Sequence, residues 1–501
     1  MLLMGVDMGT SGCKAVVFDG SWNVVCEAYR EYGLSFPGDG LLEIDPDVVW
    51  QNIREVIAEA NSRSGGVAEA LAVSAIGDVI IPLGDSDIPI RDAIIDFDPR
   101  GTAQIGRFTK DFGVERFFGI TGMPPLFIGS LAKMLWLKES EPRVWAQVKR
   151  WATFEDFIVG RLGLVPCVSD SEAARTMLFD IRKRRWSSEV LEAVSVREDQ
   201  LPRTVRSGVV IGRLDSEKAG SLGFKREVTV ASGGHDMVCA AVGAGLDERH
   251  GNTGVDIAGT IEGIVAAMPE PNTESVMLEN LFSCYPAYDG YVTFSVNLTA
   301  GCIVRWYRDM LAREQYDQSL AAGQNFYQQM LEHIDIANPG SLLLLPHFSG
   351  SGNPWFNPDA KGALYGLTLD SRREDISRAI IEGLCYELKL HSDAFKKAGI
   401  HINTLRAVGG GARIDRQLQL KANITGLKII KGSVLESSAL GAAAYAGVAM
   451  GVLAHPSEAY RAAAANECAF EPDKEAHKRF DIAFSRYQRL SRAINDFESV
   501  I

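Results

Sequence analysis

The sequence lacks the features that mark several classes of protein. It has 8 cysteines in 501 residues, and their positions show neither paired metal-ligand spacing nor the density of a secreted disulfide scaffold. No apolar run approaches the ~20 residues that a bilayer-spanning helix needs, and the first apolar segment already ends at Asp7. Lysine and arginine total 51 against 64 aspartates and glutamates, so the basic excess that binds nucleic-acid backbones is missing. We therefore expect a cytoplasmic protein with no membrane segment and no nucleic-acid partner.

What remains is the composition of a folded globular protein. Apolar residues make up 46% and charged residues 23% of the chain, close to the average for globular domains. At 501 residues the chain exceeds the roughly 250–300 residues at which one hydrophobic core stops growing, which predicts two large domains. One compact basic run, Arg182 to Arg185, is interpreted as a solvated turn in preference to a binding patch.

The apolar pattern alternates between strands and helices, which predicts an α/β fold. Strands at Leu2 to Val6 and Ala15 to Phe18 flank a glycine-rich turn, and a helix from Asp47 to Ala60 follows the start signal Asp45-Pro46. Further strands are expected at 70–76, 228–231, 261–267, 341–345 and 405–408, and helices at 373–398, 414–425 and 475–499. A boundary near residue 245 divides the chain into domains at 1–245 and 246–501.

Two short turns repeat one pattern. Gly9-Thr10-Ser11-Gly12 follows Asp7, and Gly259-Thr260 follows Asp256, each time before an apolar strand. Glycine lets backbone N–H groups converge on an anion such as phosphate, although one such turn alone is a common hairpin. The repetition indicates an internal duplication whose two turns could hold the phosphates of a nucleotide from both sides. Neither the Walker spacing nor the Rossmann fingerprint is present.

Two other motifs each allow two interpretations. The run Gly409 to Gly411 lies between a predicted strand and a predicted helix, where it either admits a flat adenine or forms a tight turn. Asp236 follows Gly233-Gly234-His235 at a predicted strand end. Its carboxylate could accept the proton of an alcohol during phosphoryl transfer, or it could cap a helix N-terminus. The residues alone leave both choices open.

Taken in order, these pieces resemble the FGGY carbohydrate kinases. The most specific segment is Gly362-Ala363-Leu364-Tyr365-Gly366-Leu367, followed seven residues later by Asp375-Ile376-Ser377-Arg378-Ala379-Ile380-Ile381-Glu382, which fits the family's C-terminal signature. The N-terminal signature is matched by Ser130, Lys133, Met134, Trp136 and Leu137, and departed from by Ile128 and Ser140. Gly441-Ala442-Ala443 also matches, so the resemblance runs from about residue 2 to about residue 455.

The resemblance implies two ribonuclease-H-like domains of the actin and hexokinase superfamily, with a cleft that closes on ATP, Mg²⁺ and a sugar. Asp236 would be the catalytic base and lie with His235 at the sugar, while Asp7 would position Mg²⁺ through water. The implied ATP contacts are Thr10, Ser11 and Lys14 from the first domain, and Gly259, Thr260, Gly410, Gly411 and Arg413 from the second. A homodimer is compatible with the sequence, which does not decide the oligomeric state.

The chain departs from the family at the positions that contact the substrate. It has Gly77-Asp78 where relatives carry a basic or amide side chain, and Asp96 where many carry tryptophan, whereas Asp98 and Arg100 fit. Extra carboxylates favour a hydroxyl-rich neutral substrate over an acid, so Asp78, Asp96 and Asp98 are expected to contact a sugar or polyol. A ketopentose such as xylulose is the first expectation, with ribulose, glycerol, gluconate or a ketohexose as alternatives. Asp96 could instead cap a turn beside Pro99.

The same fold also serves proteins that are not metabolite kinases. Actin-like filaments and heat-shock chaperones use ATP to drive conformational change, and a silent sensor of sugar and nucleotide would keep the fold without the reaction. Asp236 together with the C-terminal signature favours an active kinase over these rivals.

Overall fold

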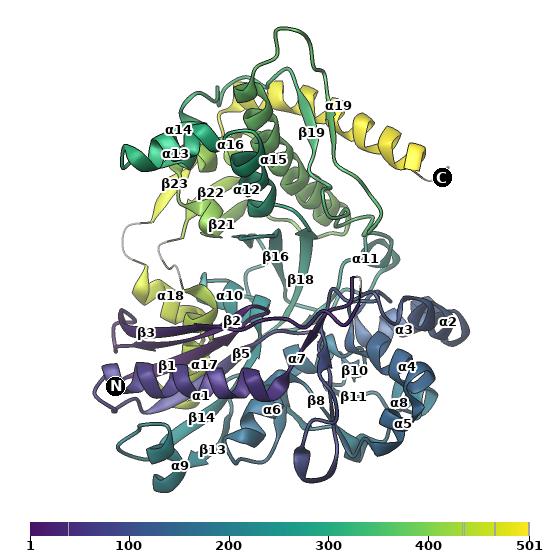
Figure 1. Ribbon diagram of the computed structural model, residues 1–501, viewed down its shortest axis with the longest axis vertical. Coiled ribbons are helices and arrows are strands. Elements are labelled where there is room, and N and C mark those ends of the chain that lie inside the picture. Colours follow the sequence, from purple (N-terminus) through teal and green to yellow (C-terminus); the bar gives the residue numbers. More distant parts are fainter. Residues whose placement is uncertain (39, 433, 435, 465–466, 499–501) are drawn as a thin grey trace.

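The computed structural model describes all residues of the chain except 39, 433, 435, 465–466 and 499–501. Figure 1 shows two bodies, each built on a mixed β-sheet with helices packed against it. The chain runs through the lower body first, then crosses to the upper one. No helix in the described part of the chain is both long and apolar enough to cross a membrane.

The first sheet has the strand order β13-β14-β5-β1-β2-β3. Its strands are β1 (Leu3–Met8), β2 (Gly12–Phe18), β3 (Val24–Glu31), β5 (Ala70–Ala75), β13 (Val210–Leu214) and β14 (Val228–His235). β1 runs parallel to β5, and β5 parallel to β14, so the carboxyl ends of these three strands lie at one edge of the sheet.

The second sheet has the order β17-β18-β16-β15-β21-β22-β23. Its strands are β15 (Thr253–Ala258), β16 (Glu262–Met268), β17 (Tyr285–Pro286), β18 (Tyr291–Asn297), β21 (Thr404–Gly409), β22 (Lys428–Lys431) and β23 (Cys468–Phe470). Read from β23 toward β18, the strands repeat the order and the directions of the first sheet, with β15 in the place of β1. The internal duplication expected from the two turns is thus present in the fold.

The long helices begin and end close to where the sequence predicts. Helix α1 (Pro46–Arg63) starts because the Asp45 carboxylate accepts hydrogen bonds from the amides of Asp47 and Val48. Helix α15 (Arg373–Lys397) and helix α16 (Asp415–Thr425) also fall on predicted segments. Helix α19 (Lys474–Glu498) confirms the amphipathic C-terminal helix, whose predicted last residue lies outside the described residues.

The remaining elements are short and connect or cover the sheets. The other helices are α2 (Thr102–Phe112), α3 (Val114–Thr121), α4 (Ser130–Ser140), α5 (Pro142–Gln147), α6 (Phe154–Arg161), α7 (Asp170–Arg175), α8 (Ser188–Val194), α9 (Ser216–Ser221), α11 (Ser275–Glu279), α12 (Gly301–Met310), α13 (Arg313–Ala321) and α14 (Phe326–Glu332). The small strands are β4 (Glu43–Ile44), β6 (Ile81–Leu83), β7 (Ala93–Ile94), β8 (Arg150–Ala152), β9 (Cys167–Ser169), β10 (Phe179–Asp180), β11 (Arg185–Trp186), β12 (Arg203–Val205), β19 (Leu343–Leu345) and β20 (Ala363–Tyr365).

Helix α17 (Ser437–Ala449) comes from the second half of the chain but packs on the first sheet, against β1, β5 and β14. Its small residues allow the backbones to touch. A Cβ at Gly5 would lie 1.8 Å from the Ala439 carbonyl oxygen, and one at Gly441 would lie 1.9 Å from the Cys239 carbonyl oxygen. Figure 1 shows this late helix in the lower body. The division at residue 245 stays a prediction, and the second half contributes this helix to the first body.

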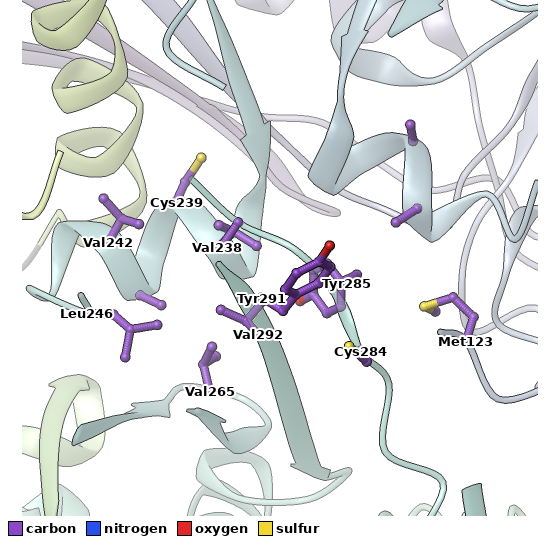
Figure 2. Close-up of a cluster of buried hydrophobic side chains, with 14 of the residues drawn as sticks. Met123, Val238, Cys239, Val242, Leu246, Val265, Cys284, Tyr285, Tyr291 and Val292 are labelled. Carbon is purple, nitrogen blue, oxygen red and sulfur yellow. The ribbon is translucent and has the colours of Figure 1, made fainter. Parts of the chain in front are cut away.

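A shared apolar core joins the two bodies. Helix α10 (Asp236–Gly243) follows β14 directly and leads into the second sheet. Figure 2 shows Val238 and Val242 projecting from this helix beside Tyr291 and Val292, which lie on the neighbouring strand β18. All four side chains belong to one buried cluster. His235 at the end of β14 and Asp236 at the start of α10 therefore lie at the junction of the two bodies.

Candidate active site

Three strand ends bring polar side chains together at one edge of the first sheet. Asp7 on β1 and Ser74 on β5 are paired in register, and the Ser74 hydroxyl donates a 2.8 Å hydrogen bond to Asp7 Oδ1. His235 ends β14, and Asp236 follows at the first position of α10. Burial raises the pKa of Asp7 to about 6 against the lowering effect of Ser74, and the Glu436 charge adds to the rise.

The Asp236 carboxylate is held by its own backbone and not as a helix cap. His235 occupies the N-cap position, and Asp236 Oδ1 accepts a 2.6 Å hydrogen bond from the Met237 amide. Burial raises the pKa of Asp236 to about 8, and the nearby charges of Asp7 and Asp96 contribute to this shift. No hydrogen bond among the described residues engages Oδ2, so this oxygen is free to take a proton. The capping alternative is thus not what the structure shows.

His235 connects Asp236 to the second body. Its Nε2 lies 3.2 Å from Asp236 Oδ1, and its Nδ1 lies 3.3 Å from the hydroxyl of Tyr285, which comes from β17. Burial and the Arg175 charge hold the pKa of His235 well below its usual range, so the imidazole is neutral. When the Tyr285 hydroxyl donates to Nδ1, Nε2 carries the proton on the side of the ring that faces Asp236.

Asp78 forms a buried ion pair with Arg175, from the end of α7. The guanidinium donates to Asp78 Oδ2 from Nε, at 3.2 Å, and from Nη2. The other oxygen, Asp78 Oδ1, is buried without a partner among the described residues. The other face of Arg175 stacks on Tyr285 and Phe294 of the second body, with its guanidinium carbon 5.2 and 5.0 Å from their ring centres. Asp78 itself has φ 65°, a strained value for a residue with a side chain.

Asp96 and Lys133 lie beside this pair. Lys133 is fully buried and donates a 3.0 Å hydrogen bond to the Asp96 backbone carbonyl. Burial, reinforced by Asp78, raises the pKa of Asp96, and burial lowers that of Lys133. Asp96 Oδ1 is a second buried carboxylate oxygen without a partner among the described residues. Buried polar atoms are normally hydrogen-bonded, so these two unpartnered oxygens are candidates to accept from a donor outside the chain.

The small residue at position 77 has a steric reason. A Cβ there would lie 2.5 Å from His235 Cδ2 and 3.1 Å from Arg175 Cγ. The side chains of His235 and Arg175 therefore fill the space into which a side chain at position 77 would point.

Asp98 is engaged within the protein. Its oxygens accept hydrogen bonds from the Leu42 amide at 2.7 Å, from the Arg100 amide at 2.9 Å and from the Arg100 side chain. Burial opposes ionisation, but the Arg100 hydrogen bonds outweigh it and lower the pKa of Asp98. It is Asp98, and not Asp96, that accepts the turn hydrogen bond after Pro99. A direct sugar contact by Asp98 stays a prediction.

The first Gly-Thr turn, with Thr10 and Ser11, lies at the same edge as Asp7. The Tyr32 hydroxyl braces it, 2.6 Å from the Gly9 carbonyl and 3.0 Å from the Gly12 carbonyl. Lys14 on β2 forms a 2.8 Å ion pair with Glu436, next to α17. A phosphate contact by Lys14 would require exchanging this carboxylate for phosphate oxygens.

A cavity of about 440 Å³ lies in the second body. It contains all five nucleotide contacts expected from the second domain, namely Gly259, Thr260, Gly410, Gly411 and Arg413. Its apolar lining includes Val304, Met330, Leu331, Ile381, Leu384 and Ile414. This volume and lining are typical of small-ligand sites. Thr10, Ser11 and Lys14 are not part of its lining.

Of the three glycines at 409–411, two leave no space for a side chain and one does. Gly409 has φ 87°, and a Cβ there would lie 2.5 Å from the Ala258 carbonyl oxygen. A Cβ on Gly411 would lie 2.7 Å from that of Ala258, whereas one on Gly410 would meet nothing within 4 Å. The tight-turn interpretation accounts for Gly409 and Gly411. Gly410 has no such internal reason and faces the cavity.

The two carboxylates that precede the turns are not equivalent. Asp7 stands two residues before Gly9, but Asp256 stands three residues before Gly259. Because strand side chains alternate, this offset sends Asp256 to the opposite face. There Lys421 forms a buried ion pair with it, and also binds Glu262 at 2.6 Å. The second repeat thus has no counterpart of Asp7 at its turn.

Several site residues escaped sequence reasoning. Arg175, Tyr285 and Phe294 lie in no motif, and only the tertiary structure brings them beside Asp78 and His235. Arg305 lines the 440 Å³ cavity and approaches the Thr260 hydroxyl at 3.5 Å. The sequence identified Lys133 as a signature residue, but it did not indicate that Lys133 would be buried beside Asp96.

The duplicated sheets, with a ligand-sized cavity and a carboxylate-rich edge at their junction, define a two-domain α/β kinase fold of the actin and hexokinase type. Comparison with known proteins agrees. The N-terminal domain of the FGGY family of carbohydrate kinases matches residues 2–243, and its C-terminal domain matches residues 257–450. The chain therefore belongs to the FGGY family of carbohydrate kinases and is an ATP-dependent phosphotransferase.

Named relatives differ in substrate. The chain is 28% identical to a xylulose kinase of Bacillus subtilis, over all of this chain and 98% of the relative. It is 30% identical to a glycerol kinase of Rhodospirillum rubrum, over 91% of this chain and 92% of the relative. A solved gluconate kinase from Lactobacillus acidophilus superimposes with a TM-score of 0.87 at 23% identity, covering 98% of both chains. The family and the fold are thus established, while the relatives point to more than one acceptor.

Proposed function

We propose that the chain transfers the γ-phosphoryl group of ATP to a hydroxyl of a neutral ketopentose such as xylulose, with Asp236 as the base. The observation that carries this proposal is the pair of unpartnered buried oxygens, Asp78 Oδ1 and Asp96 Oδ1, beside a carboxylate whose pKa is raised to about 8. Carboxylate oxygens are strong acceptors for hydroxyl groups. A substrate with several hydroxyls satisfies both.

Asp236 has the geometry that a general base needs. The Met237 amide donates to Oδ1 and His235 Nε2 lies 3.2 Å from the same oxygen, which leaves Oδ2 to accept the proton of the attacking hydroxyl. The Tyr285 hydroxyl sets the imidazole tautomer, and burial together with the Arg175 charge keeps the imidazole neutral. The two bodies thus cooperate in orienting one carboxylate.

The ATP ligand fits the second body, with its adenosine in the 440 Å³ cavity and Arg305 and Arg413 near its phosphates. Asp7 fits a role in holding Mg²⁺, because its carboxylate offers the hard oxygen ligand that this ion prefers. Asp7 also lies close enough to Asp236 for its charge to raise the pKa of Asp236. When bound, Mg²⁺ would neutralise phosphate charge. The chain's own residues account for proton removal.

A neutral acceptor is favoured over an acid on charge grounds. Asp78 and Arg175 already form a buried ion pair, and Asp96 lies next to Lys133, so each cation near the pocket has a carboxylate neighbour. A sugar acid would bring an additional charge into this balance, and a buried charge without a partner is costly. Xylulose is preferred because xylulose kinases are among the relatives that align over the full chain.

ADP release over a panel of substrates tests the proposal. Xylulose, ribulose, glycerol, gluconate and a ketohexose should be compared at equal concentration with Mg²⁺ and ATP. We expect the highest kcat/KM for a ketopentose and the lowest for gluconate. A higher value for gluconate would overturn the neutral-substrate proposal, and a higher value for glycerol would overturn the choice of ketopentose. No turnover with any of them would favour a silent sensor.

Substitution of the base provides the first prediction. Asp236→Asn should lower kcat by about 10²–10⁴-fold, because the amide cannot accept the hydroxyl proton. ATP affinity and the circular dichroism spectrum should be unchanged, since Asn retains the shape and can still accept from the Met237 amide. Near-normal turnover of the variant would contradict the role of Asp236.

A further inference from the structure

A cluster of metal-ligand side chains lies outside the active site, at the junction of the two bodies. Its members are Asp247, Glu248 and His455, and one ligand atom from each lies within 4.8 Å of the others. Asp247 and Glu248 belong to the segment that leads from α10 into β15. His455 belongs to the segment that leads from α17 to α18 (Ser457–Ala463). The first segment connects the first body to the second, whereas the second joins two helices that pack against each other, with α18 also contacting α10.

The two central atoms are buried and lack hydrogen bonds. Glu248 is 0% and His455 1% exposed. Within the described part of the chain, Glu248 Oε2 and His455 Nε2 have no hydrogen-bond partner. Since buried polar atoms are normally satisfied, two unpartnered ligand atoms that face each other call for a third species.

The distance between His455 Nε2 and Glu248 Oε2 fits a shared metal ion better than a hydrogen bond. His455 Nε2 lies 3.4 Å from Glu248 Oε2 and 3.8 Å from Asp289 Oδ2, beyond the usual N–H···O range. Zinc binds nitrogen and carboxylate oxygen at ~2.0–2.2 Å, so ligand atoms around a tetrahedral ion lie ~3.4 Å apart. The observed spacing therefore needs only small movements to enclose an ion.

The surrounding groups orient these ligands. Both the hydroxyl and the backbone amide of Ser457 lie at His455 Nδ1, at 2.8 and 3.2 Å. Metal binding at Nε2 requires the tautomer in which Nδ1 donates to the hydroxyl in place of accepting from the amide. The Tyr288 amide donates a 3.2 Å hydrogen bond to Glu248 Oε1, and Arg249 binds both oxygens of Asp247 at 2.7 Å. Every ligand thus has a second contact that fixes its direction.

We propose that Glu248, His455 and Asp247, with Asp289 at the rim, bind one divalent zinc-type metal ion that joins the α10–β15 segment to the α17–α18 segment. An imidazole with carboxylates suits Zn²⁺ or Co²⁺ better than Mg²⁺, which prefers oxygen ligands alone. The site is separate from the phosphoryl-transfer residues, and the proposal does not depend on which sugar is phosphorylated.

Metal titration of the full-length protein tests the site. The protein is stripped with chelator and kept in excess Mg²⁺, and Zn²⁺ binding is measured by calorimetry and Co²⁺ binding by visible absorption. We expect one equivalent of each to bind and Zn²⁺ to raise the Tm. Glu248→Gln and Asp247→Asn keep the side-chain shapes and should weaken binding by at least about 10-fold. Ser457→Ala should weaken it by about 10–100-fold.

A second surface pair provides the control. His477 Nε2 lies 3.5 Å from Asp481 Oδ2 on α19, where both side chains are partly exposed and could bind metal adventitiously. His477→Gln should leave Zn²⁺ affinity and the Tm rise unchanged. Binding that is absent, or that is equally strong in all variants of the cluster, would overturn the site and leave His455 and Glu248 as an ion pair only.

Discussion

Burial, with the charges of Asp7 and Asp96, determines the pH at which the Asp236 base can act. The pKa of Asp236 is raised to about 8 by burial, with the Asp7 charge next in importance and a contribution from Asp96. A general base acts in its ionised form, so kcat/KM should rise with pH and level off above about 8. A bound Mg²⁺ ion would lower this midpoint in the ternary complex, so the free-enzyme parameter kcat/KM is the one to measure.

One substitution tests the electrostatic origin of that midpoint. Asp96→Asn removes a negative charge near Asp236, so the Asp236 carboxylate ionises more easily and the acid limb of kcat/KM should move to lower pH. The comparison is a pH profile of the wild type and the variant with the same sugar. Asp85→Asn, at an exposed position, should leave the profile unchanged. An unmoved limb in Asp96→Asn would show that Asp96 does not act on the base.

Asp96 should also help to select the sugar. Because Asp96 Oδ1 is buried and unpartnered, a hydroxyl that reaches it gains a charge-assisted hydrogen bond. Asp96→Ala should lower kcat/KM for the preferred sugar by about 10-fold or more, with little change in ATP affinity. The order of preference among ketopentoses, ketohexoses and glycerol should change too. An unchanged order with unchanged kcat/KM would assign Asp96 a structural role.

At the scale of residues, the sequence indicated which residues belong to the candidate site better than it indicated which residues contact them. Asp7, His235 and Asp236 could be named because each stands at a strand end beside glycines. Arg175 could not, because nothing near it in the sequence indicates that Tyr285 and Phe294 will cover its guanidinium. Asp98 was expected at the sugar, yet in the structure its oxygens bind Arg100 and Leu42.

At the scale of elements, strands and helices were predictable because their signals are local. The Asp45 cap and the apolar period of α1 lie within one segment, as do the strands on either side of the first turn. The packing of α17 on the first sheet was not predictable, since its small residues become informative only once Gly5 and Cys239 are placed against them. The sequence does indicate that Asp256 lies on the opposite face of its sheet, because Asp256 stands one residue further from its turn than Asp7 does.

The open glycines of the turns should control nucleotide binding. A Cβ at Gly9 or Gly259 would meet protein atoms only at 3.6 Å or more, and one at Gly410 would meet none within 4 Å. Leucine at any of these positions should therefore be tolerated by the fold but should obstruct a ligand. We expect a Kd for ATP at least about 10-fold higher in each variant, measured by titration. Gly220→Leu, at an open position in α9, is the control that should bind normally. Unchanged affinity in Gly9→Leu alone would remove the first turn from the phosphate site.

At the scale of the whole molecule, the reacting groups are divided between the bodies. The nucleotide cavity is lined entirely by residues of the second half of the chain, whereas Asp7, Thr10 and Asp236 belong to the first. Phosphoryl transfer requires the two sets to meet, and water must be excluded so that the phosphoryl group is not hydrolysed. The Arg175 stack on Tyr285 and Phe294 is a contact between the bodies that such a movement would have to keep or rearrange.

Sugar and nucleotide together should therefore compact the molecule. Small-angle scattering should give a smaller radius of gyration at saturating sugar and a non-hydrolysable ATP analogue than for the free protein, because the sugar's hydroxyls and the phosphates hold the two bodies together. Asp96→Ala at the same sugar concentration, too low to saturate the weakened site, should show a smaller change, which separates sugar-driven closure from an effect of the nucleotide alone. Identical profiles for free and doubly liganded wild-type protein would contradict closure. The cavity and the base would then have to meet through local movement of the turns at Thr10 and Thr260.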